Sequence, residues 1–279
     1  MNIIAPAKLN LYLHITGRRD DGYHLLESIF VFTTFGDEIT ITPASTLSVT
    51  IDGPFCASLA SESPEGNLAY RAAALLQKKY AVDQGAHIHI TKNIPVGAGL
   101  GGGSSDAAAV LKGLNQLWHI NCDDQSLAAL GFSLGADIPA CVIQKPVFVS
   151  GIGEIIKPID LSLASSVLLV NPNHYLSTPA VFQQYKKNNS GFTKGMEGMP
   201  GTTYPLPFSN DLESAAIQLL PDIQVILDTL KKQTGCTLAR MSGSGATCFA
   251  LFQDAASMRT AEKNIRKIFP MYWVQCTTV

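Results

Sequence analysis

The sequence has no excess of charge of either sign and no long apolar run. Its 279 residues include 20 basic and 22 acidic side chains, for a net charge of −2. A strongly basic surface is typical of nucleic-acid binders, so the composition argues against that class. No apolar run approaches the roughly 18 residues of a membrane-spanning helix, and the first residues lack the pattern of a secretory signal. We therefore expect a cytoplasmic protein that binds neither nucleic acid nor membrane.

Cysteine and histidine spacings typical of metal sites are also lacking. The six cysteines, at positions 56, 122, 141, 236, 248 and 276, include no C-x-x-C pair. We expect reduced cysteines, no disulfide or zinc framework and no metal-ligating residues. The length suits one large or two medium domains. Hydrophobic residues make up 46% of the chain and charged residues 15%, which is enough apolar sequence for a substantial core.

Glycine, by contrast, is concentrated in one short segment. Five glycines stand at positions 97, 99, 101, 102 and 103, followed by Ser104, Ser105 and Asp106. Residues 87–91 alternate as in a strand, and residues 106–111 are alanine-rich and apolar as in a helix. A glycine-rich loop before a helix binds anions, because its backbone N–H groups converge and the helix dipole adds positive charge. The segment therefore predicts a phosphate site.

Other interpretations of this loop differ in their support. It is not a Walker A loop, because no Lys-Ser or Lys-Thr pair closes it. It does match G-x-G-x-x-G, and Asp123 and Asp124 stand about where a dinucleotide fold would bind a ribose. In that fold the acidic residue ends a second strand, whereas residues 111–118 keep helical spacing. A glycine-rich turn without a ligand remains the simpler alternative.

Two charged residues are candidates for chemistry on a bound phosphate. Lys8 begins an alternating strand, where a solvated strand-end lysine is the alternative. Asp137 stands among apolar residues, where an unpaired carboxylate is costly; its alternative role is to cap a helix that begins near Pro139. Phosphoryl transfer needs a cation against the developing charge and a group that orients or accepts the acceptor's proton.

The remaining pattern mixes strands and helices. We expect a hairpin of residues 37–42 and 47–51, a helix over 67–80, strands 238–241 and 247–252 around a second glycine turn at 242–245, and a mobile loop over 188–207.

Three segments together resemble the motifs of a known superfamily. They are Pro6-Ala7-Lys8-Leu9-Asn10-Leu11, the glycine-loop segment 95–105, and the segment 241–249, Met-Ser-Gly-Ser-Gly-Ala-Thr-Cys-Phe. On these motifs the chain is identified as a member of the galactokinase, homoserine kinase, mevalonate kinase and phosphomevalonate kinase (GHMP) superfamily. The resemblance implies an α+β fold of two GHMP kinase domains. The first, residues 1–155, would bind ATP and resemble the second domain of ribosomal protein S5; the second, residues 156–279, would be ferredoxin-like.

Two further segments narrow the resemblance. Gly22-Tyr23-His24 and the segment 134–139, Leu-Gly-Ala-Asp-Ile-Pro, are similar to those of the members that phosphorylate a cytidylyl methylerythritol in the non-mevalonate isoprenoid pathway. This implies transfer of the ATP γ-phosphate, with Mg²⁺ as cofactor, to the 2-hydroxyl of that small molecule. Two alternatives stay open: another kinase of the superfamily, such as a homoserine kinase, and a catalytically inactive relative that senses a ligand. The oligomeric state is not predicted.

The resemblance also implies roles for individual residues. Lys8 corresponds to the catalytic lysine and Asp137 to the general base. The expected ATP-binding residues are Asn67, Leu68, Lys92, Pro95, Val96, Gly97, Ala98, Gly99, Leu100, Gly101, Gly102, Gly103, Ser104 and Ser105. The expected substrate-binding residues are Asn10, Tyr23, His24, Thr178, Phe182, Gly243 and Ser244. Tyr23, His24 and Phe182 would hold the cytosine, although ordinary strand packing remains the alternative for Tyr23 and His24. Ala98 replaces a common loop glycine, and we expect its small methyl to leave the loop intact.

Overall fold

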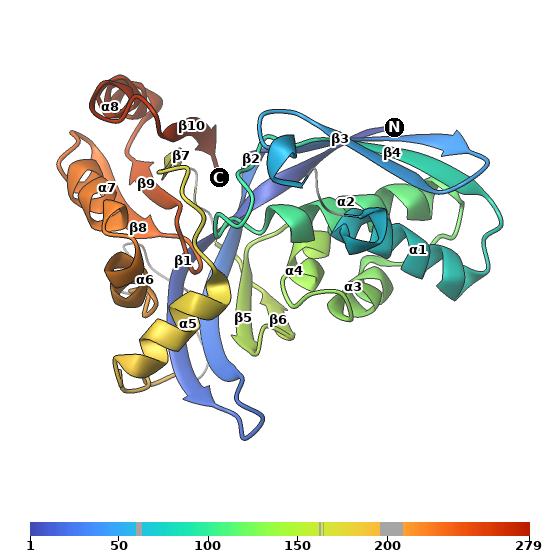
Figure 1. The fold of residues 1–279 in the computed structure, drawn as a ribbon, viewed down its shortest axis with the longest axis horizontal. Coiled ribbons are helices and arrows are strands. Elements are labelled where there is room, and N and C mark those ends of the chain that lie inside the picture. The colour runs from blue at the N-terminus through green and yellow to red at the C-terminus, as the bar shows by residue number, and fades with distance from the viewer. Residues whose placement is uncertain (60–62, 162, 164, 196–208) are drawn as a thin grey trace. The chain divides into compact units, whose positions relative to one another are not determined.

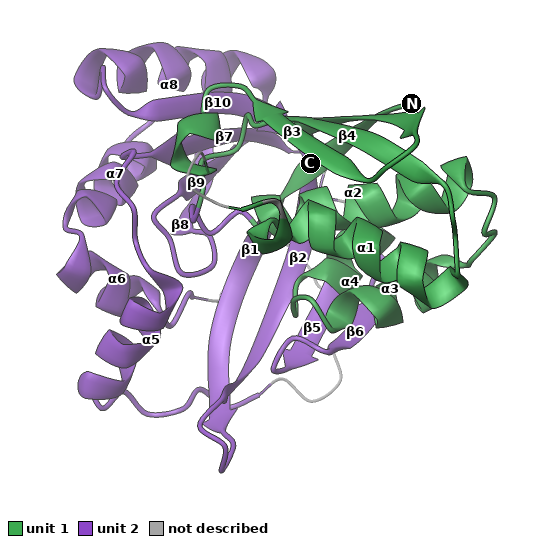
Figure 2. Ribbon diagram, turned by 45° about the vertical axis from the view of Figure 1, so that its right-hand side comes forward, with its two compact units in different colours: residues 1–8, 35–96, 101–145 green, residues 9–34, 97–100, 146–279 purple. Residues whose placement is uncertain are grey.

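The computed structural model describes residues 1–59, 63–161, 163, 165–195 and 209–279. The chain forms two compact units that are interleaved along the sequence (Figures 1 and 2). Unit 1 contains residues 1–8, 35–96 and 101–145, and unit 2 contains residues 9–34, 97–100 and 146–279. The expected boundary between residues 155 and 156 divides the chain into two continuous domains, unlike these units, and stays a prediction.

Two long strands pass through both units, and they carry several candidate residues. β1 (Asn2–Arg18) pairs with β2 (His24–Ala44). The alternation of β1 predicts one apolar and one polar face, but residues 5–15 are buried throughout. Lys8 and Asn10 are consequently buried polar residues, and such residues need hydrogen-bond or ionic partners.

In unit 1, helices cover a small sheet (Figure 2). β4 (Gly85–Thr91) lies between β2 and β3 (Ser48–Asp52), antiparallel to β2 and parallel to β3. The helices are α1 (Leu68–Tyr80), α2 (Gly102–Leu117), α3 (Asp124–Phe132) and α4 (Ile138–Ile143), with short 3-10 helices at Cys56–Leu59 and Pro64–Gly66. α1 packs on α2, and α4 contacts α2 and α3.

The predicted hairpin of residues 37–42 and 47–51 is wrong, whereas the predicted helix over 67–80 is confirmed. β4 inserts between the two strands that were expected to pair, so Ile39 lies opposite Ile90 and Val49 opposite Ile88. The alternation identified strands correctly, but the pairing partner comes from a distant part of the chain. The helix, α1, begins at Leu68.

In unit 2, a four-stranded antiparallel sheet has the order β10-β7-β9-β8. Its strands are β7 (Ser166–Asn171), β8 (Cys236–Met241), β9 (Cys248–Phe252) and β10 (Trp273–Thr278). The helices are α5 (Thr178–Lys187), α6 (Glu213–Leu219), α7 (Asp222–Lys231) and α8 (Ala255–Ile268). β5 (Val147–Gly151) and β6 (Ile155–Pro158) form a further antiparallel pair beside β2.

The order of these elements in unit 2 is ferredoxin-like, as expected. The two predicted strands around residues 242–245 are confirmed as the antiparallel pair β8 and β9. α7 and α8 pack on the sheet (Figure 1), and Leu168 of β7, Leu227 of α7 and Ile265 of α8 belong to one buried core.

Two further expectations concern the mobile loop and membrane-spanning helices. Residues 196–208, most of the expected mobile loop, lie outside the described residues. Of the helices described, none has both the length and the apolar character that crossing a membrane requires.

Candidate active site

The glycine loop has a backbone conformation that requires glycine at alternate positions. Gly97, Gly99 and Gly101 have φ angles of 66°, 75° and 65°, in the left-handed region that residues with a Cβ rarely adopt. Ala98 does not have a positive φ, so the departure from glycine there causes no strain. Gly101 is the N-cap residue of α2. The unpaired N–H groups of the first helical turn therefore follow directly on the loop.

Within unit 1, Lys8 and Asp137 form an ion pair beside the end of this loop. Nζ of Lys8 lies 3.1 Å from Oδ2 of Asp137, and their side chains are 5% and 34% exposed. A Cβ placed on Gly101 would lie 3.1 Å from Cε of Lys8 and 3.7 Å from Oδ2 of Asp137. A side chain at position 101 would thus press on the buried stem of Lys8, next to the partly exposed carboxylate of Asp137.

The structural alternatives for these two residues are not supported by this geometry. Lys8 is buried rather than solvated. Asp137 does precede α4, but it has helical φ and ψ angles and its side chain makes no capping hydrogen bond. A capping aspartate normally has extended backbone angles and accepts an N–H bond from the first turn.

Lys92 lies in a buried ionic cluster with two carboxylates that the sequence analysis did not identify. Its ammonium bonds to Oδ2 of Asp37 and, at 2.6 Å, to Oδ2 of Asp106. Asp37 is on β2, Lys92 follows β4, and Asp106 is on α2, so no local spacing connects the three. The available signal for the cluster was Asp106, a carboxylate directly before the apolar run of residues 107–111. Because the ammonium is enclosed by these two carboxylates, we expect Lys92 to influence ATP binding only indirectly, through the residues that it contacts.

Asn67 and Leu68 lie at the start of α1. Oδ1 of Asn67 accepts the N–H of Ala69 at 2.9 Å and caps the helix. Cδ1 of Leu68 lies 3.5 Å from the position of a Cβ on Gly103, so α1 reaches the first turn of α2. The other expected ATP-binding residues differ in burial: Pro95, Leu100 and Ser105 are buried, and Val96, Gly102 and Ser104 are half-buried.

In unit 2, residues of the two glycine turns contact each other. The hydroxyl of Ser242 donates to the carbonyl of Gly99 at 2.9 Å and accepts the N–H of Asn10 at 3.2 Å. A Cβ on Gly99 would overlap the carbonyl oxygen of Ser242, so the two backbones pack without room for a side chain. A Cβ on Gly243 would lie 3.4 Å from Oδ1 of Asn10. Asn10, Gly99 and Gly243 are therefore neighbours.

Unit 2 contains the residues expected around the cytosine, and two of them are in contact. The rings of His24 and Phe182 stack with centroids 5.2 Å apart and an interplanar angle of 25°. Tyr23 is 63% exposed, which leaves its ring available to a ligand. Burial, with the positive charges of Arg18 and Lys186, lowers the pKa of His24, so its ring is neutral at neutral pH. A neutral imidazole both donates and accepts a hydrogen bond.

Thr178, the first residue of α5, and Tyr175, shortly before it, complete this region of unit 2. Thr178 and Ser244 share a hydroxyl hydrogen bond of 2.7 Å, which links α5 to the second glycine turn. Tyr175, which the sequence analysis did not identify, is 77% exposed, and its Cε2 atom lies 2.8 Å from the position of a Cβ on Gly97. An aromatic residue shortly before Ser177-Thr178 was the only signal for it.

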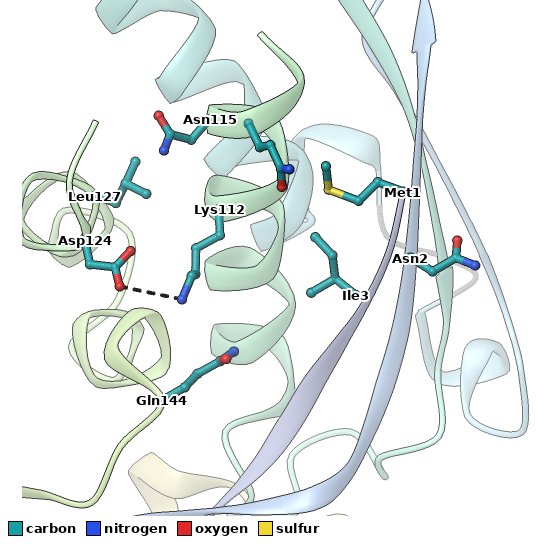
Figure 3. Close-up of a pocket in the computed structure, with 10 residues that line it drawn as sticks. Met1, Asn2, Ile3, Lys112, Asn115, Asp124, Leu127 and Gln144 are labelled. Carbon is teal, nitrogen blue, oxygen red and sulfur yellow. Dashed lines mark ion pairs between the residues drawn. The ribbon is translucent and has the colours of Figure 1, made fainter. Parts of the chain in front are cut away.

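A separate cavity of about 410 Å³ lies in unit 1, near the C-terminal end of α2 (Figure 3). Three of its polar side chains, Lys112, Asn115 and Asp124, already have partners. Lys112 donates to the carbonyl of Val142 at 3.1 Å and lies 3.7 Å from Asp124, and the Asn115 amide exchanges two hydrogen bonds with the Cys122 backbone. None of the expected site residues lines this cavity, so it is not a candidate for the active site.

Comparison with protein families identifies the class. The model of the GHMP kinases N terminal domain matches residues 67–145, and that of the GHMP kinases C terminal domain matches residues 202–270. The glycine loop, the Lys8–Asp137 pair and the ferredoxin-like sheet are thus parts of a GHMP small-molecule kinase.

Comparison with individual proteins narrows the class. A 4-diphosphocytidyl-2-C-methyl-D-erythritol kinase of Chelativorans sp. (strain BNC1) is 40% identical over 99% of this chain and 95% of its own length. The enzyme of that name from Paracoccus denitrificans (strain Pd 1222) is 44% identical over 97% of this chain and 93% of its own. A crystal structure of 4-(cytidine 5'-diphospho)-2C-methyl-D-erythritol kinase, 31% identical, covers both chains completely with a TM-score of 0.81. The chain belongs to the 4-diphosphocytidyl-2-C-methyl-D-erythritol kinase family of the GHMP kinases.

The resemblance and the α+β fold with two GHMP kinase domains are confirmed by these comparisons. The roles of the individual site residues are not tested by them and remain proposals.

Proposed function

We propose that this chain transfers the γ-phosphate of ATP to the 2-hydroxyl of 4-diphosphocytidyl-2-C-methyl-D-erythritol. The names of its relatives support this acceptor, since they are 40–44% identical over nearly the whole chain. The observation that carries the chemical part of the proposal is the Lys8–Asp137 ion pair, with Gly101 in close contact. Phosphoryl transfer is catalysed mainly by positioning and by charge stabilisation, and this pair supplies groups for both.

Asp137 would accept the proton of the acceptor's 2-hydroxyl group. At the same time, the oxygen of that hydroxyl group would form a bond to the γ-phosphorus of ATP. The bond from that phosphorus to the bridging oxygen breaks, and ADP leaves. The partial exposure of Asp137 supports this role, because a base has to come within hydrogen-bond reach of the hydroxyl. Lys8 would hold the Asp137 carboxylate in place and stabilise negative charge on the transferred group.

The cytosine would be held by Tyr23, His24 and Phe182. Phe182 already stacks on His24, so the base would enter beside this stack and against the exposed ring of Tyr23. A neutral His24 would offer one ring nitrogen as donor and the other as acceptor. Thr178, Ser244, Gly243 and Asn10, which are linked by the contacts of the second glycine turn, would bind the rest of the acceptor.

The phosphates of ATP would lie on the loop of residues 95–105 and the first turn of α2, with Asn67 and Leu68 near the adenine. Mg²⁺ is part of this proposal as the counter-ion of those phosphates. The described residues contain no group of three or more His, Cys, Asp or Glu side chains that could hold a metal. Mg²⁺ usually keeps several waters and binds through substrate phosphates and one or two carboxylates.

The test is an assay of ATP consumption with three acceptors: the cytidylyl methylerythritol, homoserine and mevalonate. We expect turnover with the first and background rates with the other two. Turnover with homoserine or mevalonate alone would assign a different kinase of the superfamily, and no turnover with ATP binding intact would favour a ligand sensor. The cytoplasmic location also stays a proposal, which cell fractionation tests.

A further inference from the structure

The buried cluster under the first turn of α2 combines three charged groups with an imbalance of charge. Asp37, Lys92 and Asp106 are 0%, 3% and 5% exposed. One ammonium faces two carboxylates, so the cluster carries one net negative charge when all three groups are ionised. A buried charge without full compensation is costly. The cluster therefore needs either a further positive partner or a proton.

The two carboxylates are not equally stabilised as anions. Oδ1 of Asp37 accepts the N–H groups of Asn93 and Ile94 at 2.6 and 2.8 Å, and its Oδ2 accepts from Lys92. Asp106 uses only Oδ2, and its buried Oδ1 has no hydrogen-bond partner among the described residues. Asp106 is consequently the carboxylate that takes the proton.

The titratable groups around Asp106 agree with this assignment. Burial, together with the charge of Asp37, raises the pKa of Asp106 to about 7, although Lys92 opposes the shift. The two carboxylates keep Lys92 charged, since their attraction outweighs burial and raises its pKa. Cys141 of α4 also faces Asp106, but burial raises the pKa of its thiol, which stays protonated. Lys8 and Asp137, the residue before α4, are the remaining charged groups near Cys141, and they form an ion pair with each other.

The cluster is in direct contact with the proposed phosphate-binding end of α2. A Cβ on Gly102, the first residue of α2, would lie 3.1 Å from Nζ of Lys92 and 3.4 Å from Oδ2 of Asp37. The first turn of α2, which is the positive end of its dipole, thus lies against the cluster and directly follows the glycine loop in the chain. Phosphate bound at this turn would compete with Asp106 for the same positive potential.

We propose that Asp37, Lys92 and Asp106 position the first turn of α2 for the ATP phosphates, and that Asp106 takes up a proton when these phosphates bind. The inference rests on the proposed function, because it assumes that the loop binds ATP. Asp106 acts through α2 and touches neither ATP nor the acceptor; it is a positioning residue.

The test measures protons taken up per ATP bound. Calorimetric titration with Mg-ATP in two buffers of different ionisation enthalpy gives that number for the native chain, for Asp106→Asn and for Asp124→Asn. Asp124 is the matched control, because its side chain is 58% exposed and lies in the same unit. If bound phosphate raises the pKa of Asp106 by about one unit, the native chain takes up roughly 0.4 proton more than Asp106→Asn near pH 7. Asp124→Asn keeps the native value.

A second measurement keeps the proposal falsifiable should Asp106→Asn fold poorly. Carbon-13 NMR of aspartate carboxyls in the native chain follows the titration of Asp106 with and without ATP. Its midpoint moves upward on binding if Asp106 takes up a proton. An unchanged midpoint, or equal proton uptake by the native chain and Asp106→Asn, overturns the inference while leaving ATP binding in place. Failure of the native chain to bind ATP overturns the proposed function and the inference together.

Discussion

The contact between Gly101 and the Lys8–Asp137 pair predicts the effect of one added methyl group. Gly101→Ala places a Cβ at a residue with φ of 65° and 3.1 Å from Cε of Lys8. The left-handed conformation costs roughly 1–2 kcal/mol for a residue with a Cβ. Lys8 also has to move by a few tenths of an ångström, although it is buried. We expect Tm to fall by about 2–8 °C, because 1 kcal/mol corresponds to about 2–4 °C in a protein of this size.

The same substitution should reduce kcat more than ATP binding. Displacement of a catalytic group by as much as about 1 Å costs on the order of 100-fold, so a smaller shift of Lys8 predicts a loss of roughly 10-fold. Gly103→Ala is the control, since Gly103 is helical and a Cβ there would meet only Cδ1 of Leu68, at 3.5 Å. It should raise stability by about 0.5–1 kcal/mol. Thermal denaturation and steady-state kinetics of both variants are the assay, and equal Tm and kcat values for the two would refute the reasoning.

Three further predictions concern individual groups. Asp137→Asn should lower kcat by roughly 100-fold or more with little change in ATP affinity; near-native kcat in steady-state assays would leave Asp137 without a role as base. Tyr23→Ala should raise KM for the cytidylyl acceptor about 10-fold, because lost stacking of about 1–3 kcal/mol acts on that substrate alone; an equal rise in KM for ATP would contradict the cytosine assignment. The lowered pKa of His24 means that the unfolded chain binds more protons, so its contribution to stability is complete above about pH 6.5 and declines as pH falls below that value; urea unfolding of the native chain and His24→Gln at several pH values would show a smaller acid loss in the variant.

Local features of the sequence were sufficient for the glycine loop and for several helices. Glycine at positions 97, 99 and 101 reflects a backbone requirement that any compatible fold must meet. The helix that begins at Leu68 has its own signal in the capping residue Asn67. Both features depend on neighbours in the chain, so the sequence alone could predict them.

Pairings between distant segments could not be predicted in the same way. β3 pairs with β4 rather than with β2, and β4 is separated from β3 in the chain by α1. α5 was not predicted as a helix, although Thr178 and Phe182 were identified within it. The cluster of Asp37, Lys92 and Asp106 has no sequence pattern, since each residue comes from a different element. Burial decides its chemistry, and burial depends on the complete fold.

The most direct test of the central claim is the position of the phosphate in the product. The native chain is incubated with Mg-ATP and the cytidylyl methylerythritol, and phosphorus–carbon coupling in the NMR spectrum of the product locates the new phosphate. The account predicts one new phosphate, on the 2-hydroxyl, and at least roughly 100-fold slower product formation with Asp137→Asn. A phosphate on another hydroxyl, or an Asp137→Asn variant that forms product at the native rate, would contradict it.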